Sequence, residues 1–225
     1  MRFVAVHGVP LGPRSFSRLA TPVDALALQG LTTVADRPSW SLRSFVDEVA
    51  PHVDRDTVLI GHDLGGVIAA MVALERPARG VILTGTALGP YWAAVRATAH
   101  PALSRFFYDR HQGRRFVAGG VGEAVRERFV AEAEPDLAAV PDLAGRMRRL
   151  ATEMRPPPGL GRRLATATSV ALVWGEHDRW YPAPIARAVA RACRAPLTWV
   201  PGGHYAAWEA PEAFDAALAE ATAGW

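Results

Sequence analysis

Short runs of apolar residues recur along the chain, separated by stretches rich in glycine, proline and charged residues. Runs of this kind are typical of strands that a parallel sheet buries on both faces. The pattern predicts strands at Phe3–Val6, Leu31–Ala35, Val58–Ile60, Val81–Leu83, Val170–Trp174 and Leu197–Val200.

Segments with helical periodicity lie between most of these runs. Ser41–Val53 begins with a serine suited to capping a helix and places its apolar residues on one face. Further helices are predicted at Leu64–Glu75, Pro182–Cys193 and about Ala207–Ala223. This alternation of strands and helices indicates an α/β fold with a mostly parallel, doubly wound sheet.

Residues 87–165 interrupt the alternation because they contain no clear strand. Their pattern predicts helices around Pro101–Arg110, Gly122–Ala133 and Asp136–Met154, with breaks at Gly119-Gly120, Pro135, Pro141 and Pro156-Pro157-Pro158. We therefore expect a core domain made of residues 1–86 and 166–225, and a helical cap inserted between them.

Composition and charge restrict the function further. Half of the 225 residues are hydrophobic, which is enough for one domain with a large core. The chain has no lysine, and its 25 basic residues are arginines spread along the sequence, with a net charge of +3. A nucleic-acid binder needs a concentrated basic face, so we expect solvated surface arginines and no nucleic-acid partner.

The sequence also bears on the compartment. A single cysteine, Cys193, cannot form an intrachain disulfide. The first residues lead straight into a strand pattern and lack the apolar stretch of a signal peptide. The longest apolar run, Val67–Leu74, is too short to span a bilayer. We expect a cytoplasmic protein with no membrane partner.

The strongest local motif is Gly61-His62-Asp63-Leu64-Gly65-Gly66, between a predicted strand and a predicted helix. A sharp strand-to-helix turn exposes its central side chain, and glycines allow the backbone segments to approach closely. Asp63 is therefore a candidate nucleophile, with the Leu64 N–H placed to stabilise an oxyanion. The alternative is that Asp63 only caps the helix.

Three further loops follow predicted strands. In His7-Gly8-Val9-Pro10, the Val9 N–H is a candidate second oxyanion donor, although His7 could be only a packed polar residue. Asp178 ends the run Trp174-Gly175-Glu176-His177-Asp178, where Glu176 and His177 compete with it for a functional role. The last loop, Gly202-Gly203-His204-Tyr205, carries a candidate histidine base.

The order Asp63, Asp178, His204 resembles that of the α/β-hydrolase fold superfamily over nearly the whole chain. The family's usual first two strands are missing, so the resemblance implies a sheet of about six strands. The aspartate in the strand-to-helix turn at Gly61–Gly66, the elbow, and the His-Gly-X-Pro loop resemble the branch of epoxide hydrolases and haloalkane dehalogenases.

This resemblance implies a covalent mechanism. Asp63 attacks an electrophilic carbon and forms an ester, which water activated by His204 and Asp178 then hydrolyses. No metal, nucleotide or flavin cofactor is required. Haloalkane dehalogenases carry halide donors where this chain has Leu64 and Val9, so epoxide opening is favoured over dehalogenation.

In related epoxide hydrolases, cap tyrosines protonate the leaving alkoxide. Tyr108 is the candidate here, and Tyr91 is a substitute because no second cap tyrosine is evident. The residues expected to bind a small hydrophobic substrate are Tyr91, Trp92, Phe107 and His62.

Two other functions stay open. One is a non-hydrolytic enzyme of natural-product biosynthesis that catalyses cyclisation, rearrangement or C–C bond formation. The other is a non-catalytic receptor that binds a small ligand under the cap. The sequence leaves the substrate and the oligomeric state open, with a homodimer as one possibility.

Overall fold

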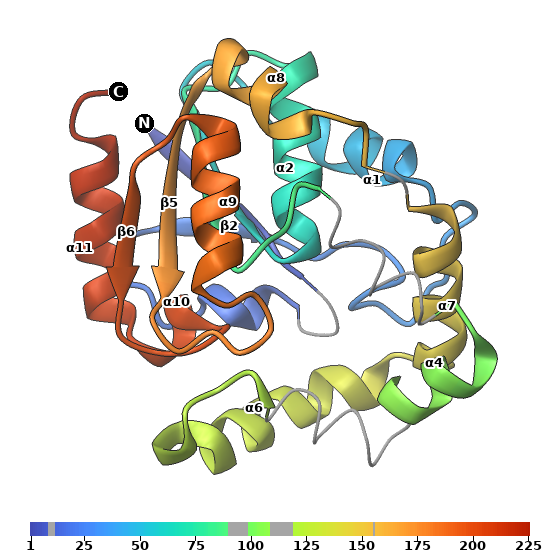
Figure 1. The fold of residues 1–225 in the computed structure, drawn as a ribbon. Coiled ribbons are helices and arrows are strands. Elements are labelled where there is room, and N and C mark those ends of the chain that lie inside the picture. Colours follow the sequence, from blue (N-terminus) through green and yellow to red (C-terminus); the bar gives the residue numbers. More distant parts are fainter. Residues whose placement is uncertain (9–11, 90–98, 109–118, 155) are drawn as a thin grey trace.

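The computed structural model describes residues 1–8, 12–89, 99–108, 119–154 and 156–225, with residues 106–108 and 134–139 in backbone only. Its parallel strands form one sheet in the order β2-β1-β3-β4-β5-β6 (Figure 1). The strands are β1 (Arg2–Val6), β2 (Val23–Leu26), β3 (Thr57–His62), β4 (Gly80–Thr84), β5 (Ser169–Gly175) and β6 (Leu197–Val200). The predicted fold class is confirmed.

Alternate residues of the strands point to opposite faces of the sheet, as the two-residue period of a strand requires. In β3, for example, Leu59 packs on one face while Val58 and Ile60 pack on the other. The first face is covered by α1 (Leu42–Val49), α2 (Leu64–Glu75), α8 (Leu160–Ala167) and α9 (Ala183–Cys193). The second is covered by η1 (Pro13–Phe16), α10 (Ala206–Glu209) and α11 (Pro211–Thr222).

The segment between β4 and β5 is helical wherever it has regular structure within the described residues. Its elements before α8 are α4 (Pro101–Tyr108), η3 (Glu123–Val125), α6 (Arg126–Ala139) and α7 (Leu143–Glu153). Figure 1 shows α6 on the side of the molecule toward which β5 and β6 point. Because α8 packs against α2 and α9, the predicted boundary at residue 165 falls inside a helix that is attached to the core.

The strand predicted at Leu31–Ala35 is wrong, and β2 takes its place in the sheet. The cause lies in α7, where the buried side chain of Arg146 reaches the backbone of this segment. Its guanidinium donates hydrogen bonds to the carbonyl oxygens of Gly30 (2.7 Å), Thr33 (2.9 Å) and Val34 (2.7 Å). Carbonyls that turn toward one cation cannot also face a neighbouring strand, so the segment is a loop.

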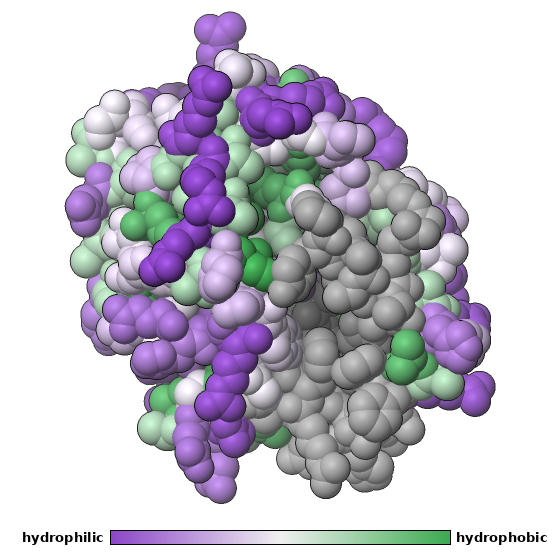
Figure 2. Space-filling view, in the orientation of Figure 1, coloured by the Kyte–Doolittle hydropathy of each residue, from purple (hydrophilic) through white to green (hydrophobic). Residues whose placement is uncertain are grey.

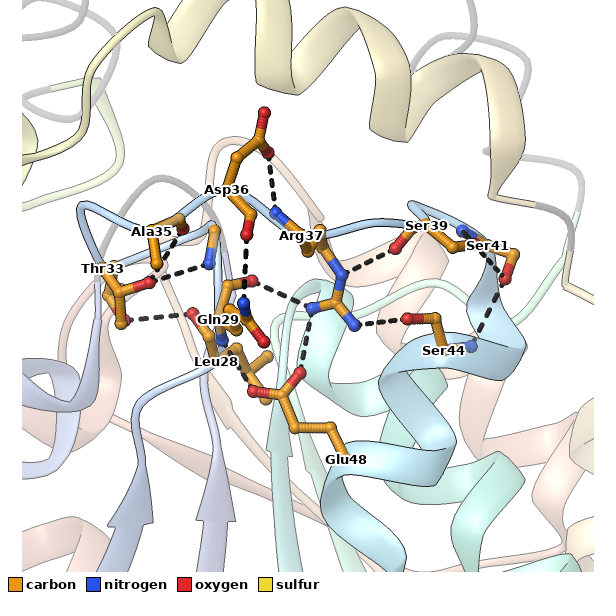
Figure 3. A network of polar contacts seen from close by, with 12 residues as sticks. Leu28, Gln29, Thr33, Ala35, Asp36, Arg37, Ser39, Ser41, Ser44 and Glu48 are labelled. Atoms are coloured by element: carbon orange, nitrogen blue, oxygen red, sulfur yellow. Dashed lines mark hydrogen bonds and ion pairs between the residues drawn. The ribbon is translucent and has the colours of Figure 1, made fainter.

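A second arginine, Arg37, connects the same loop to α1 (Figure 3). Arg37 donates to the carbonyl oxygen of Gln29 (2.9 Å), the hydroxyl of Ser44 (2.8 Å) and the carboxylate of Glu48 (2.9 Å). Its guanidinium also lies 3.5 Å from the ring centroid of Phe45. The buried cation therefore has several partners and fixes the loop to α1.

Two predicted helix boundaries are also wrong. The break expected at Pro135 is absent, and α6 continues to Ala139. The break predicted at Pro141 is present, between α6 and α7, where the Asp142 side chain accepts a hydrogen bond from the Gly145 N–H (3.2 Å) and caps α7. The C-terminal helix is divided at Ala210, because Pro211 begins α11.

Exposed arginines lie along the outer surface of α9. Arg187 and Arg191 are exposed one turn apart on this helix. Figure 2 shows hydrophilic residues along the same helix and hydrophobic residues interspersed beside them. Surface arginines of this kind are solvated, as the even spread of charge along the sequence predicts.

We expect Arg146→Met to lower the free energy of unfolding by about 3 kcal/mol, because the buried Gly30 carbonyl and the other carbonyls of the loop lose a charged donor. Arg148→Met is the matched control, since Arg148 is exposed on the same helix. It should change stability by less than about 0.5 kcal/mol. Urea unfolding of the three proteins checks this, and equal stabilities for both variants would contradict the role of Arg146.

Candidate active site

Asp63 occupies a strained turn between β3 and α2. Its backbone has φ 51° and ψ −120°, a combination that an L-residue adopts at a cost of about 1–3 kcal/mol. A Cβ on Gly65 would lie 1.9 Å from the carbonyl oxygen of Val6, so only glycine fits there. The Asp63 side chain makes no hydrogen bond that caps α2, and the capping alternative is therefore not supported.

His204 and Asp178 come together at the carboxyl ends of β6 and β5. The Nδ1 of His204 lies 3.1 Å from Oδ2 of Asp178, and both side chains are buried. Because a carboxylate accepts, Nδ1 carries the proton and neutral His204 keeps its lone pair on Nε2. This Nε2 has no hydrogen-bond partner among the described residues, which suits a base that acts on water or substrate.

The structure distinguishes Asp178 from its two competitors. Glu176 and His177 are exposed, whereas Asp178 is 5% exposed. Oδ1 of Asp178 accepts hydrogen bonds from the N–H groups of Trp180 and Tyr181, both at 2.9 Å. These bonds hold the carboxylate so that its other oxygen faces His204.

Charges around His204 determine its protonation. Burial acts to lower the pKa of His204. The Asp178 carboxylate opposes this effect through its charge and hydrogen bond, and the charges of Asp63 and Glu209 add to it. The pKa of His204 consequently lies above its ordinary value, and the imidazole is neutral only above that raised pKa.

Tyr181, which was not among the predicted site residues, contacts Asp63, His204 and Asp178. Its hydroxyl donates to Oδ1 of Asp63 (2.9 Å), and its ring stacks on His204 with a centroid separation of 5.5 Å. Its N–H donates to Asp178, as described above. The sequence feature that points to Tyr181 is its position three residues after Asp178, in a turn whose N–H groups the Asp178 carboxylate binds.

Glu209 was also missed. Its carboxylate accepts hydrogen bonds from the N–H groups of Gly122 (2.9 Å) and Tyr205 (3.2 Å), and also from that of Gly203. Burial raises the pKa of Glu209, although these N–H groups oppose the shift. Glu209 therefore joins the backbone on both sides of His204 to the segment that precedes α6.

The loop after β1 borders the Asp63 carboxylate. A Cβ on Gly8 would lie 2.6 Å from Oδ2 of Asp63, so glycine is required for this approach. His7 is fully buried and accepts a hydrogen bond from the Leu28 N–H (3.2 Å). This contact supports the packed polar role for His7, while Val9 lies outside the described residues.

His62, predicted to bind substrate, lies beneath the loop that carries His204. It is 3% exposed, and its Nε2–H donates to the carbonyl oxygen of His204 (3.0 Å). Burial and the charge of His204 hold the pKa of His62 well below its ordinary value. Through this hydrogen bond, the neutral ring of His62 holds the backbone of His204 in place.

The remaining predicted residues lie in the helical insertion. Tyr108 and Phe107 end α4, and their side chains are outside the described part of the chain. Tyr91 and Trp92 lie in a segment that is not described. Among the described residues, no group of three or more metal-binding side chains gathers, and no helix is both long and apolar enough to cross a membrane.

Comparison with known proteins identifies the family. The sequence matches the alpha/beta hydrolase family over residues 3–217, and the chain therefore belongs to that family. No curated protein sequence matches it significantly.

Solved structures with the same fold have several activities. A thermophilic esterase from Thermogutta terrifontis superposes with a TM-score of 0.74 at 20% identity, covering 98% of this chain and 88% of its own. The enol-lactonase from Burkholderia xenovorans LB400 gives 0.74 at 14% identity, covering 99% and 91%. The epoxide hydrolase CorEH gives 0.71 at 15% identity, also covering 99% and 91%. At these identities the likeness shows the fold alone.

We expect the ring of His204 to titrate with a pKa above the 6.5 of an unperturbed histidine. Glu209→Gln should lower this pKa, because it removes a negative charge that favours the protonated ring. Glu212→Gln, at an exposed position of α11, should leave the pKa unchanged. Histidine NMR titrations, with His204→Gln used for assignment, check this. A His204 pKa that is the same in the Glu209 variant and the wild type would contradict it.

Proposed function

We propose that this protein is an epoxide hydrolase-like enzyme that acts on a small hydrophobic substrate through a covalent ester on Asp63. The observation that carries the proposal is a carboxylate at the strained elbow, beside a buried His204–Asp178 pair. Membership of the alpha/beta hydrolase family supports a hydrolase, and the fold likeness to CorEH is compatible with epoxide chemistry.

A carboxylate suits attack on a saturated carbon for a chemical reason. When Asp63 opens an epoxide, the product is an alkyl ester, which water can cleave at the carbonyl carbon. A serine in the same place would form an ether, which water cannot cleave under these conditions. The residue at the elbow thus selects the class of electrophile.

Hydrolysis of the ester requires His204. In its neutral form Nε2 takes a proton from water, and the resulting hydroxide attacks the carbonyl carbon of esterified Asp63. Negative charge then develops on the Asp63 carboxyl group, whose Oδ2 faces Gly8. The N–H groups of Leu64, at the start of α2, and of Val9 are the proposed donors to this oxyanion.

The charge of Asp63 links the two steps. As a free carboxylate, Asp63 helps to raise the pKa of His204. Esterification removes this charge from Asp63 itself, and the charge passes to the departing oxygen or to the group that protonates it.

Intact-protein mass spectrometry of His204→Gln tests this proposal. The variant lacks the base, so a panel of epoxides, lactones and alkyl halides should leave a stable ester on the protein. An epoxide adds its full mass, whereas an alkyl halide adds its mass less hydrogen halide. We expect the epoxide adduct, with tryptic mapping placing it on Asp63.

Two further results decide the outcome. Asp63→Asn combined with His204→Gln should form no adduct, because its side chain is a poor nucleophile. If folded His204→Gln forms no adduct with any compound, covalent epoxide opening is wrong. The result would then favour non-covalent biosynthetic chemistry on the same fold.

A further inference from the structure

We propose that Tyr181 is the acid that protonates the leaving oxygen when Asp63 opens the epoxide, an inference that rests on the function proposed above. Its hydroxyl lies 2.9 Å from Oδ1 of Asp63, the group that reacts. The acid would then belong to the core loop after β5, and the cap tyrosine expected at Tyr108 would not be needed for this step.

The position of Tyr181 is fixed by its backbone. Its N–H donates to Oδ1 of Asp178 (2.9 Å), and its carbonyl oxygen accepts from Nε1 of the buried Trp174 (2.9 Å). Its ring is stacked on His204 at an interplanar angle of 28°. These contacts place the hydroxyl with the precision that a proton donor requires.

The two oxygens of Asp63 have different surroundings. Oδ2 faces Gly8, where the oxyanion donors are proposed, and Oδ1 accepts from Tyr181. A proton donor beside the carboxylate can transfer its hydrogen bond to an epoxide oxygen when substrate binds. The phenol is a stronger acid than the alcohol being formed, so the proton transfer is downhill.

The atoms and protons of this step balance. One Asp63 oxygen forms a bond to carbon while the C–O bond of the epoxide breaks, with its electron pair going to the departing oxygen. That oxygen takes the proton of Tyr181, which leaves a hydroxyalkyl ester and a tyrosinate. The protein then has no need of an external acid.

The second step restores the tyrosine. Water adds to the ester after giving a proton to His204, and His204 returns that proton to the alcohol oxygen that leaves Asp63. Asp63 is then a carboxylic acid within hydrogen-bond distance of the tyrosinate, and it passes its proton to Tyr181. The net reaction is the addition of one water to the epoxide, with all protein groups restored.

The test compares two electrophiles in the His204→Gln background, with and without Tyr181→Phe. Styrene oxide needs protonation of its leaving oxygen, whereas benzyl bromide expels bromide without a proton. We expect Tyr181→Phe to slow ester formation from styrene oxide by about 100-fold or more, the usual contribution of a general acid. Ester formation from benzyl bromide should change by less than about 5-fold.

Each other outcome has a separate meaning. If Tyr181→Phe slows both electrophiles equally, Tyr181 only orients Asp63 and the inference is overturned, while the proposed function stands. If Tyr108→Phe slows the epoxide reaction and Tyr181→Phe does not, the acid lies in the insertion and the inference is again overturned. If His204→Gln with Tyr181 intact forms no ester with either compound, the proposed function itself fails.

Discussion

The backbone conformation of Asp63 is the constraint on which the candidate site depends. Its φ of 51° turns the chain from β3 into α2 within one residue, so the carboxylate stands at the end of the sheet. The turn forms only because Gly65 packs against the carbonyl of Val6. Packing of α2 and β3 in the core offsets the strain, and the carboxylate is held without a helix cap.

Among the described residues, contacts near both ends of the helical insertion attach it to the core. At one end, Arg146 and Arg149 of α7 bind the loop around residues 30–36, and the second of them pairs with Asp36. At the other end, Nε1 of Trp208 donates to Glu132 of α6 (2.9 Å), and Phe129 packs on the same indole. Arginine hydrogen bonds therefore fix α7, while one indole hydrogen bond and aromatic packing hold α6.

The sequence predicted the fold because hydrophobic periodicity, glycine turns and the order of the polar loops all indicate the same topology. It failed where a distant side chain determined local structure, as Arg146 does for Leu31–Ala35. Tyr181 and Glu209 were missed for a similar reason. Their roles depend on neighbours that only the folded chain supplies, whereas Asp63 and His204 stand in recognisable loops.

The hydrogen bond from the His204 N–H to the Gly120 carbonyl (2.7 Å) makes the helical insertion and the loop that carries His204 dependent on each other. Because Gly203 approaches Gly120 too closely for any Cβ, the histidine loop and the insertion have matching surfaces. A foreign insertion grafted between β4 and β5 would have to reproduce that backbone contact. Chimeras that exchange the insertion alone would therefore misplace the base, and the segment around Gly120 must be inherited together with His204.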